Sequence, residues 1–139
     1  MNEIIYKIEK SLDPSEFHDV LIKSTLGERR PVDDFERIKK MCANANLIVT
    51  ARKEKKLIGV ARSITDFVYC TYLSDLAVDI NYQKMGVGKR LIEETKKAVP
   101  QAKIILLSAP AAIDYYPKIG MKRHEHCFTL DDISELKKQ

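Results

Sequence analysis

One segment, Leu76 to Lys89, most constrains what this chain can fold into, because a strand, a glycine turn and a helix follow one another there. Residues 68–78 are rich in Val, Tyr, Thr and Leu, which is typical of a strand. From Val87, apolar residues recur at helical spacing as far as Val99, and Pro100 ends that pattern. A strand joined by a short turn to an amphipathic helix predicts a sheet covered by helices.

The turn between this strand and helix has the composition of an anion site. The first N–H groups of a helix lack internal partners and carry the positive end of its dipole. Gly86 and Gly88 would let a phosphate approach the backbone, and Lys84 and Lys89 add positive charge. A Gly-x-Gly pair also fits a tight structural turn, so both interpretations stay open from these residues alone.

Two well-known phosphate motifs do not fit this turn. The dinucleotide-binding fingerprint needs a third glycine where this chain has Leu91. The P-loop needs glycine at Gln83 and a hydroxyl residue at Arg90.

The remaining pattern predicts alternating strands and helices. Asp13 and Pro14 are typical of a helix start, and either Asp33 or Asp34 can cap a second helix whose buried stripe holds Phe35, Ile38, Met41 and Cys42. The expected strands are 4–8, 47–51, 57–64, 68–78, 103–107 and 126–130, and the expected helices are 14–26, about 34–44, 87–99 and 111–116. We expect 103–107 to be buried on both faces because it is apolar. The order predicts a mixed sheet with helices on its faces.

Size and composition indicate one globular domain spanning residues 1–139. No apolar run approaches the roughly 20 residues of a membrane span, and the first residues do not resemble a signal peptide. Cys42, Cys70 and Cys127 are widely spaced, which predicts reduced, buried thiols and neither a metal site nor a dithiol. We therefore expect a cytoplasmic protein without a membrane partner.

The net charge of +4 comes from 24 basic and 20 acidic residues. Most of this charge is mixed in sign, and the densest basic run, 52–56, is expected to be a solvated hairpin tip. This pattern does not favour a nucleic-acid partner.

Two motifs together resemble the GCN5-related N-acetyltransferase (GNAT) family. Residues 83–88, Gln-Lys-Met-Gly-Val-Gly, are similar to the family's Gln/Arg-x-x-Gly-x-Gly/Ala motif, and Leu-Ala-Val before them is similar to its central strand. Residues 112–121 are similar to its second signature, with Ala-Ile before a Tyr-Tyr pair and Lys-x-Gly after it. The resemblance covers nearly the whole chain. It implies an α/β fold of GNAT type, with a mixed, mostly antiparallel sheet, one parallel splayed strand pair and about four helices.

The resemblance also implies the co-substrate, acetyl-CoA, in the opening between strands 68–78 and 103–107. Its pantetheine arm would pair with the backbone of Leu76, Ala77 and Val78. Its pyrophosphate would bind the turn formed by Gln83, Lys84, Met85, Gly86, Val87, Gly88 and Lys89. The implied reaction is direct acetyl transfer to a primary amine of a small molecule or peptide.

Catalytic roles follow from the same resemblance. The N–H of Leu76 would stabilise the oxyanion. Tyr116 would contact the cofactor and protonate the leaving thiolate, since a phenol with a pKa of about 10 is protonated at neutral pH. Its neighbour Tyr115 is expected to be the core aromatic.

The general base is less defined. Where relatives often have Glu on the central strands, this chain has Tyr72 and an isoleucine, Ile104 or Ile105. Asp75 is the nearest strand carboxylate and is either a base or a structural hydrogen-bonding group, and His18, His124 and His126 are alternatives by residue type.

The acceptor site is expected between the loop after the first helix and the central strand. Arg30 and Tyr72 are the predicted substrate residues, and Arg29 accompanies Arg30. The arginines would suit a carboxylate or phosphate on the acceptor, whereas Asp66, Asp75 and Tyr69 would suit a cation. A non-catalytic acyl-CoA-binding module on the same fold is the alternative function, and a homodimer stays open because no residue indicates one.

Overall fold

The computed structural model describes residues 3–138, in which five strands form one sheet in the order β1-β2-β3-β4-β5. The strands are β1 (Ile4–Ile8), β2 (Leu47–Lys53), β3 (Lys56–Thr65), β4 (Cys70–Val78) and β5 (Lys103–Ile105). The first four are antiparallel to their neighbours, and β5 is parallel to β4. The mixed, mostly antiparallel sheet with one parallel pair is therefore confirmed. Residues up to Ala109 form one compact unit and those from Pro110 form a second.

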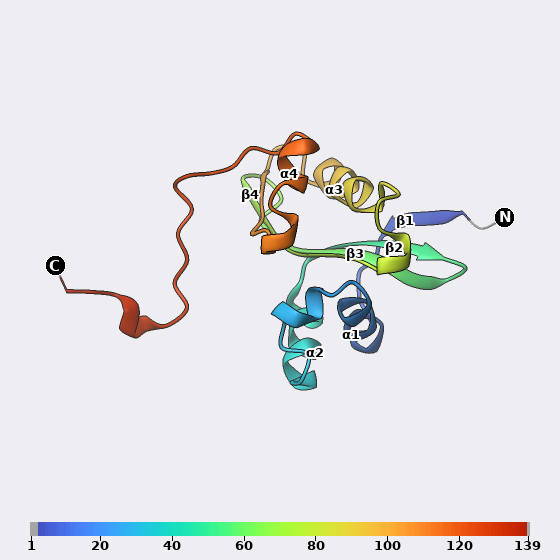
Figure 1. The fold of residues 1–139 in the computed structure, drawn as a ribbon, viewed down its shortest axis with the longest axis horizontal. Helices are drawn as coiled ribbons and strands as arrows, with labels where there is room; N and C mark the ends of the chain where they lie inside the picture. The colour runs from blue at the N-terminus through green and yellow to red at the C-terminus, as the bar shows by residue number, and fades with distance from the viewer. Residues whose placement is uncertain (1–2, 139) are drawn as a thin grey trace. The chain divides into compact units, whose positions relative to one another are not determined.

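Three helices cover the two faces of the sheet in the first unit (Figure 1). Helices α1 (Pro14–Lys23) and α2 (Phe35–Asn44) pack on one face, where Phe17 and Ile38 meet Val60 of β3. Helix α3 (Val87–Ala98) packs on the other face, where Leu91 meets Ile58. Gly59 allows this close approach, because a Cβ there would lie 3.2 Å from atoms of both Leu91 and Val87.

The β2–β3 hairpin closes at Glu54 and Lys55, which both have a left-handed backbone with φ of 50° and 71°. Two consecutive residues with positive φ form the turn that matches the twist of a two-residue hairpin. Arg52 is not the solvated side chain that we expected from the charge run. Its guanidinium donates to Glu9 (2.8 Å) and Glu16 (2.7 Å), so it ties β1 and α1 to the hairpin.

A β-bulge interrupts β4 at its centre. Leu73 pairs with Ser63, and Asp75 pairs with Arg62, so Ser74 is an extra residue in the ladder. An extra residue reverses which face the following side chains occupy. Leu73 accordingly packs on the α3 side, whereas Asp75 faces Arg62 and Ala77 packs with the α1 and α2 core.

Several predicted element boundaries were wrong. The first helix ends at Lys23, and a 3-10 helix, η1 (Leu26–Arg29), follows it in the predicted loop. Phe35 is 42% exposed, because α2 begins with it and the core lies beneath Ile38 and Cys42.

The strand predicted at 103–107 is shorter and more exposed than its apolar sequence suggested. It ends at Ile105, and both Lys103 and Ile105 are exposed. It lies at the edge of the sheet with a single strand neighbour, β4, so a second strand does not shield it.

The second unit holds three short helices and no strand among its described residues, 110–138. The predicted helix 111–116 is replaced by η3 (Pro110–Ala112) and α4 (Tyr115–Lys118). Pro117 is the third residue of α4, where a missing N–H costs no helical hydrogen bond. The predicted strand 126–130 does not form, because these residues have no ladder partner within the described chain. The third short helix of this unit is η4 (Ile133–Glu135). Within residues 3–138, no helix is both long and apolar enough to cross a membrane.

Candidate active site

Strands β4 and β5 separate soon after they meet. Their ladder joins Cys70–Tyr72 to Lys103–Ile105 and goes no further. The N–H of Asp79 donates to Ile58 of β3 at 2.8 Å, so its backbone faces β3. Because backbone groups alternate along a strand, Ala77 also faces β3, whereas Leu76 and Val78 face the edge that β5 has left. Of the three residues predicted to bind pantetheine, Leu76 and Val78 therefore have backbone groups beside an opening between the two strands, whereas those of Ala77 pair with β3.

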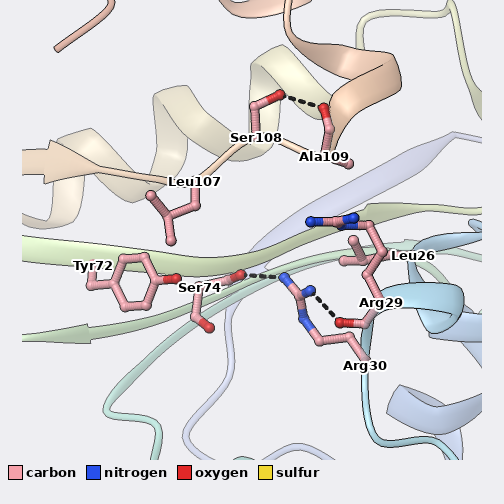
Figure 2. A pocket seen from close by; sticks show the side chains of 8 residues that line it. All are labelled: Leu26, Arg29, Arg30, Tyr72, Ser74, Leu107, Ser108 and Ala109. Atoms are coloured by element: carbon pink, nitrogen blue, oxygen red, sulfur yellow. Dashed lines mark hydrogen bonds between the residues drawn. The ribbon is translucent and has the colours of Figure 1, made fainter. Parts of the chain in front are cut away.

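A cavity of about 160 Å³ lies at this opening (Figure 2). Three segments of the first unit line it: η1 with the residue that follows it, the bulged part of β4 and the residues after β5. The lining residues are Leu26, Arg29, Arg30, Tyr72, Ser74, Leu107, Ser108 and Ala109. Two of these, Arg30 and Tyr72, are the predicted substrate residues, and the structure brings them together. None of the lining residues is a carboxylate or a histidine.

Asp75 pairs with the lining residue Arg30 in a buried charge cluster. Its side chain has no exposed area, and its two carboxylate oxygens each accept a hydrogen bond, one from Arg30 Nε and one from Arg62 Nε. Arg62 also donates to the Met41 carbonyl (2.9 Å) and to Ser74 Oγ (3.1 Å). Arg30 donates to the Ser74 carbonyl at 2.8 Å. Both oxygens of Asp75 are thus engaged, which favours a structural role over a role as a base.

Arg62 and Ser74 were missed by the sequence analysis. Their positions depend on the bulge, which turns Asp75 toward Arg62 and places Ser74 at the cavity. One sequence signal could have identified Arg62, because it is a charged residue within the apolar pattern of β3. A buried arginine needs an acidic partner, so this position predicts an ion pair.

The glycine turn leads into an uncapped helix. Gly86 is the N-cap of α3 with φ of 82°, and no side chain caps the first turn. Lys84 also has a left-handed backbone, with φ of 64°, and Met85 is 63% exposed. Gln83 closes the turn, because its side-chain amide donates to the Val78 carbonyl at 2.8 Å. The first N–H groups of α3 therefore remain available for a ligand.

Tyr116 lies in the second unit, on α4, and its ring packs edge-to-face against Tyr115 with centroids 5.2 Å apart. Burial raises the pKa of the Tyr116 hydroxyl above its ordinary value, and the neighbouring Tyr115 adds to that rise. Tyr115 is 37% exposed, so the prediction that it would be the core aromatic was wrong.

The alternative bases have other surroundings. His18 lies with its Nε2 2.9 Å from the Val32 carbonyl and does not line the cavity. His124 and His126 pack against each other in the second unit, with ring centroids 5.6 Å apart.

The cysteines also differ from expectation, since Cys42 is buried but Cys70 and Cys127 are exposed. Burial raises the pKa of the Cys42 thiol to about 11.

These features agree with a match to a known family. The acetyltransferase (GNAT) domain family matches residues 23–136, so the chain belongs to the GNAT family and carries its acetyltransferase domain. The family resemblance and the predicted GNAT fold are thereby confirmed.

Individual relatives agree with this assignment. A chloroplastic GCN5-related N-acetyltransferase 2 of Arabidopsis thaliana is 35% identical over 74 residues, which cover 51% of this chain and 29% of that protein. An N-acetyltransferase named ycf52, from Pyropia yezoensis, is 25% identical over 132 residues, which cover 81% of this chain and 76% of that protein. The chain thus spans less than a third of the length of the Arabidopsis relative.

Solved structures show the same fold. A GNAT family acetyltransferase from Streptococcus pneumoniae superposes with a TM-score of 0.78 at 17% identity, covering 96% of this chain and all of that one. The aminoglycoside N-acetyltransferase AAC(6')-Iy, solved in complex with CoA, gives a TM-score of 0.72 at 13% identity and covers 96% of this chain and 97% of its own. An aminoglycoside acetyltransferase from a soil metagenome, solved with sisomicin, gives 0.69 at 20% identity, covering 93% and 95% of the two chains.

Proposed function

We propose that this protein transfers the acetyl group of acetyl-CoA to a primary amine of a small molecule or peptide. The observation that carries the proposal is the opening between β4 and β5, where the cavity lies. The same strand, β4, leads to the turn before α3, whose first N–H groups have no side-chain cap. The CoA complex of the structural neighbour supports this choice of co-substrate.

The residues of the turn fit a pyrophosphate. Free N–H groups at the start of a helix bind phosphate oxygens, and Lys84 and Lys89 bring positive charge to the same turn. Gly86 can adopt its left-handed conformation without strain, and no atom lies within 4 Å of the position a Cβ would take. We assign the pantetheine contacts to the backbone of Leu76 and Val78, which face the open edge of β4.

The proposed chemistry is a direct displacement on a thioester. The neutral amine attacks the carbonyl carbon and forms the C–N bond, while the developing oxyanion accepts a hydrogen bond from the N–H of Leu76. The tetrahedral intermediate then collapses and the C–S bond breaks. The leaving thiolate takes a proton from the Tyr116 hydroxyl, and the surplus proton of the new amide nitrogen passes to solvent or to the tyrosinate.

The acceptor must lose its ammonium proton before it attacks, and the residues that line the cavity include no base. We propose that Asp75 does not supply one, since both of its oxygens are held by arginines. The amine would instead lose its proton to water or to a water-linked group. Catalysis would then depend on the fraction of acceptor that is neutral in solution.

This dependence predicts the pH profile. At subsaturating acceptor, kcat/KM for the amine should rise about tenfold per pH unit until the pH passes the acceptor's own pKa. The raised pKa of Tyr116 means that its proton is retained to higher pH than in an ordinary phenol, so no fall in rate is expected below about pH 10. Initial rates of thiol release from pH 6 to 10 measure the slope of this rise and show whether the rate falls at the upper end of the range. A plateau that begins well below the pKa of every acceptor would instead indicate a base in the enzyme.

Replacing Gly86 by valine should weaken acetyl-CoA binding by about 30-fold or more, because a β-branched residue resists positive φ and would stand in the path of the phosphates. Isothermal titration calorimetry with acetyl-CoA measures the effect. Lys55→Val is the matched control, because it forces the same residue into a left-handed position (φ 71°) at the β2–β3 turn. Equal affinity in the two variants would contradict the assignment of the turn.

The alternative is a non-catalytic acyl-CoA-binding module on this fold. The lack of a base among the lining residues favours it. Such a protein would bind acetyl-CoA in the calorimeter and lose affinity in Gly86→Val, but would release no thiol with any amine.

The three cysteines form no disulfide, which favours a reducing compartment. We propose the cytoplasm as the site of action.

A further inference from the structure

We propose that the acceptor amine carries an anionic group, a carboxylate or a phosphate, and that Arg29 is the residue that binds it. This inference rests on the proposed function and names the substrate class of the same site. It starts from the charge of the cavity, whose eight lining residues include two arginines, three hydroxyl residues and no acid.

Arg30 does not supply the binding charge, because its guanidinium is already used. It donates to Asp75, to the Ser74 carbonyl (2.8 Å) and to the Arg29 carbonyl (2.8 Å). Asp75 in turn is shared with Arg62 and is buried. Two arginines against one carboxylate leave the wall of the cavity with a net positive charge. No acid is left there to attract a cationic acceptor.

Arg29 differs from Arg30 although the two are adjacent. It is exposed, and its guanidinium forms no ion pair or hydrogen bond with residues 3–138. Figure 2 shows its head group reaching into the space between β4 and the segment that holds Leu107 and Ala109, while the Arg30 head group lies against Ser74. A free guanidinium at the mouth of a positively charged cavity is suited to bind an anion.

The shape and charge of the Arg29 guanidinium define the class of ligand that it would bind. A guanidinium is planar and matches the two oxygens of a carboxylate or phosphate in a bidentate geometry. The hydroxyl of Tyr72, which also lines the cavity, adds a hydrogen-bond donor. An acceptor with several ammonium groups, such as the aminoglycoside in one structural neighbour, would meet repulsion here. We therefore expect polycationic amines to be poor acceptors.

The test compares amines that differ in one charge. β-Alanine is paired with β-alaninamide and phosphoethanolamine with ethanolamine, and kcat/KM for each is read from thiol release with acetyl-CoA. Hydrogen bonds to charged groups are strong enough that the anionic member of at least one pair should be favoured about tenfold or more. The pair with the larger ratio distinguishes a carboxylate from a phosphate. Because the two members of a pair differ in amine pKa, their rates are compared per neutral amine.

Variants then assign the preference to Arg29. Arg29→Gln removes the charge and should reduce the ratio to within about twofold of unity, whereas Arg29→Lys keeps the charge and should retain part of it. Arg37→Gln, an exposed arginine on α2 that does not line the cavity, should leave the ratio unchanged. Equal rates for both members of both pairs, or a preference that survives in Arg29→Gln, would overturn the proposal.

A binding measurement separates this proposal from the proposed function. With CoA present, titration of phosphoethanolamine or β-alanine should shift the Arg29 Nε–H resonance of the folded protein, and ethanolamine should not. This readout needs no turnover, so it decides the matter even if the chain is not a catalyst. Acetyl-CoA turnover without any charge preference overturns the Arg29 assignment alone. Absence of turnover and of acetyl-CoA binding overturns the proposed function.

Discussion

Tyr116→Phe should lower kcat by about 10²–10⁴, the range for loss of a general acid, and leave acetyl-CoA affinity within about twofold. Removing the hydroxyl takes away the proton for the leaving thiolate but keeps the ring. Thiol release under saturating acetyl-CoA gives kcat, and calorimetry gives the affinity. Because burial raises the pKa of this hydroxyl, the wild-type group is protonated at neutral pH, and its loss should lower kcat already at that pH.

Tyr115→Phe is the matched control, since it removes the neighbouring hydroxyl from the same short helix. It should leave kcat within about threefold, because a phenol that is not aligned with the thiolate gives no acid catalysis. If Tyr116→Phe instead turned over like the wild type, the proton would come from another donor or from water.

Asp75→Asn should destabilise the protein by about 3–5 kcal/mol, the usual cost of breaking a buried ion pair by removing one partner. The substitution keeps the shape but leaves the Arg62 guanidinium, whose side chain is 6% exposed, without its carboxylate. Arg30 loses its partner as well. Urea unfolding measures the change, and the slope of free energy against urea should be unaltered if the fold is retained.

Two further variants show whether the loss of stability in Asp75→Asn comes from the buried ion pairs. Asp33→Asn removes an exposed carboxylate and should change the free energy of unfolding by no more than about 0.5 kcal/mol. Arg30→Gln combined with Asp75→Asn should cost less than the sum of the single changes, since it removes one of the uncompensated charges. A cost below about 1 kcal/mol for Asp75→Asn would show that the cluster is not the electrostatic anchor that its burial indicates.

The elements that the sequence predicted best are those with a strong local cause. Asp13 accepts from the N–H of Ser15 at 2.8 Å as the cap of α1, and Asp34 caps α2. The apolar period of α3 correctly identifies Val87 and Leu91 as buried. The glycine turn was predictable because positive φ at a helix start favours glycine. Arg30 and Tyr72 could be placed together because the family resemblance supplied the arrangement of strands.

The features that the sequence did not reveal depend on pairing between distant strands. The bulge at Ser74 arises from the register between β3 and β4, and no residue type marks it in advance. Without it, Asp75 would face α3 and could not meet Arg62. The exposure of Ile105 likewise follows from the position of β5 at the sheet edge. The unformed strand at 126–130 had the right composition but no ladder partner within the described chain.

The most direct test of the account is thiol release from acetyl-CoA in the presence of a panel of primary amines that includes neutral, anionic and polycationic members. We predict amine-dependent release of CoA, with one N-acetylated product formed per thiol, and loss of that activity in Tyr116→Phe. No release with any amine, measured on folded protein that binds acetyl-CoA in the calorimeter, would contradict the assignment of this chain as an N-acetyltransferase.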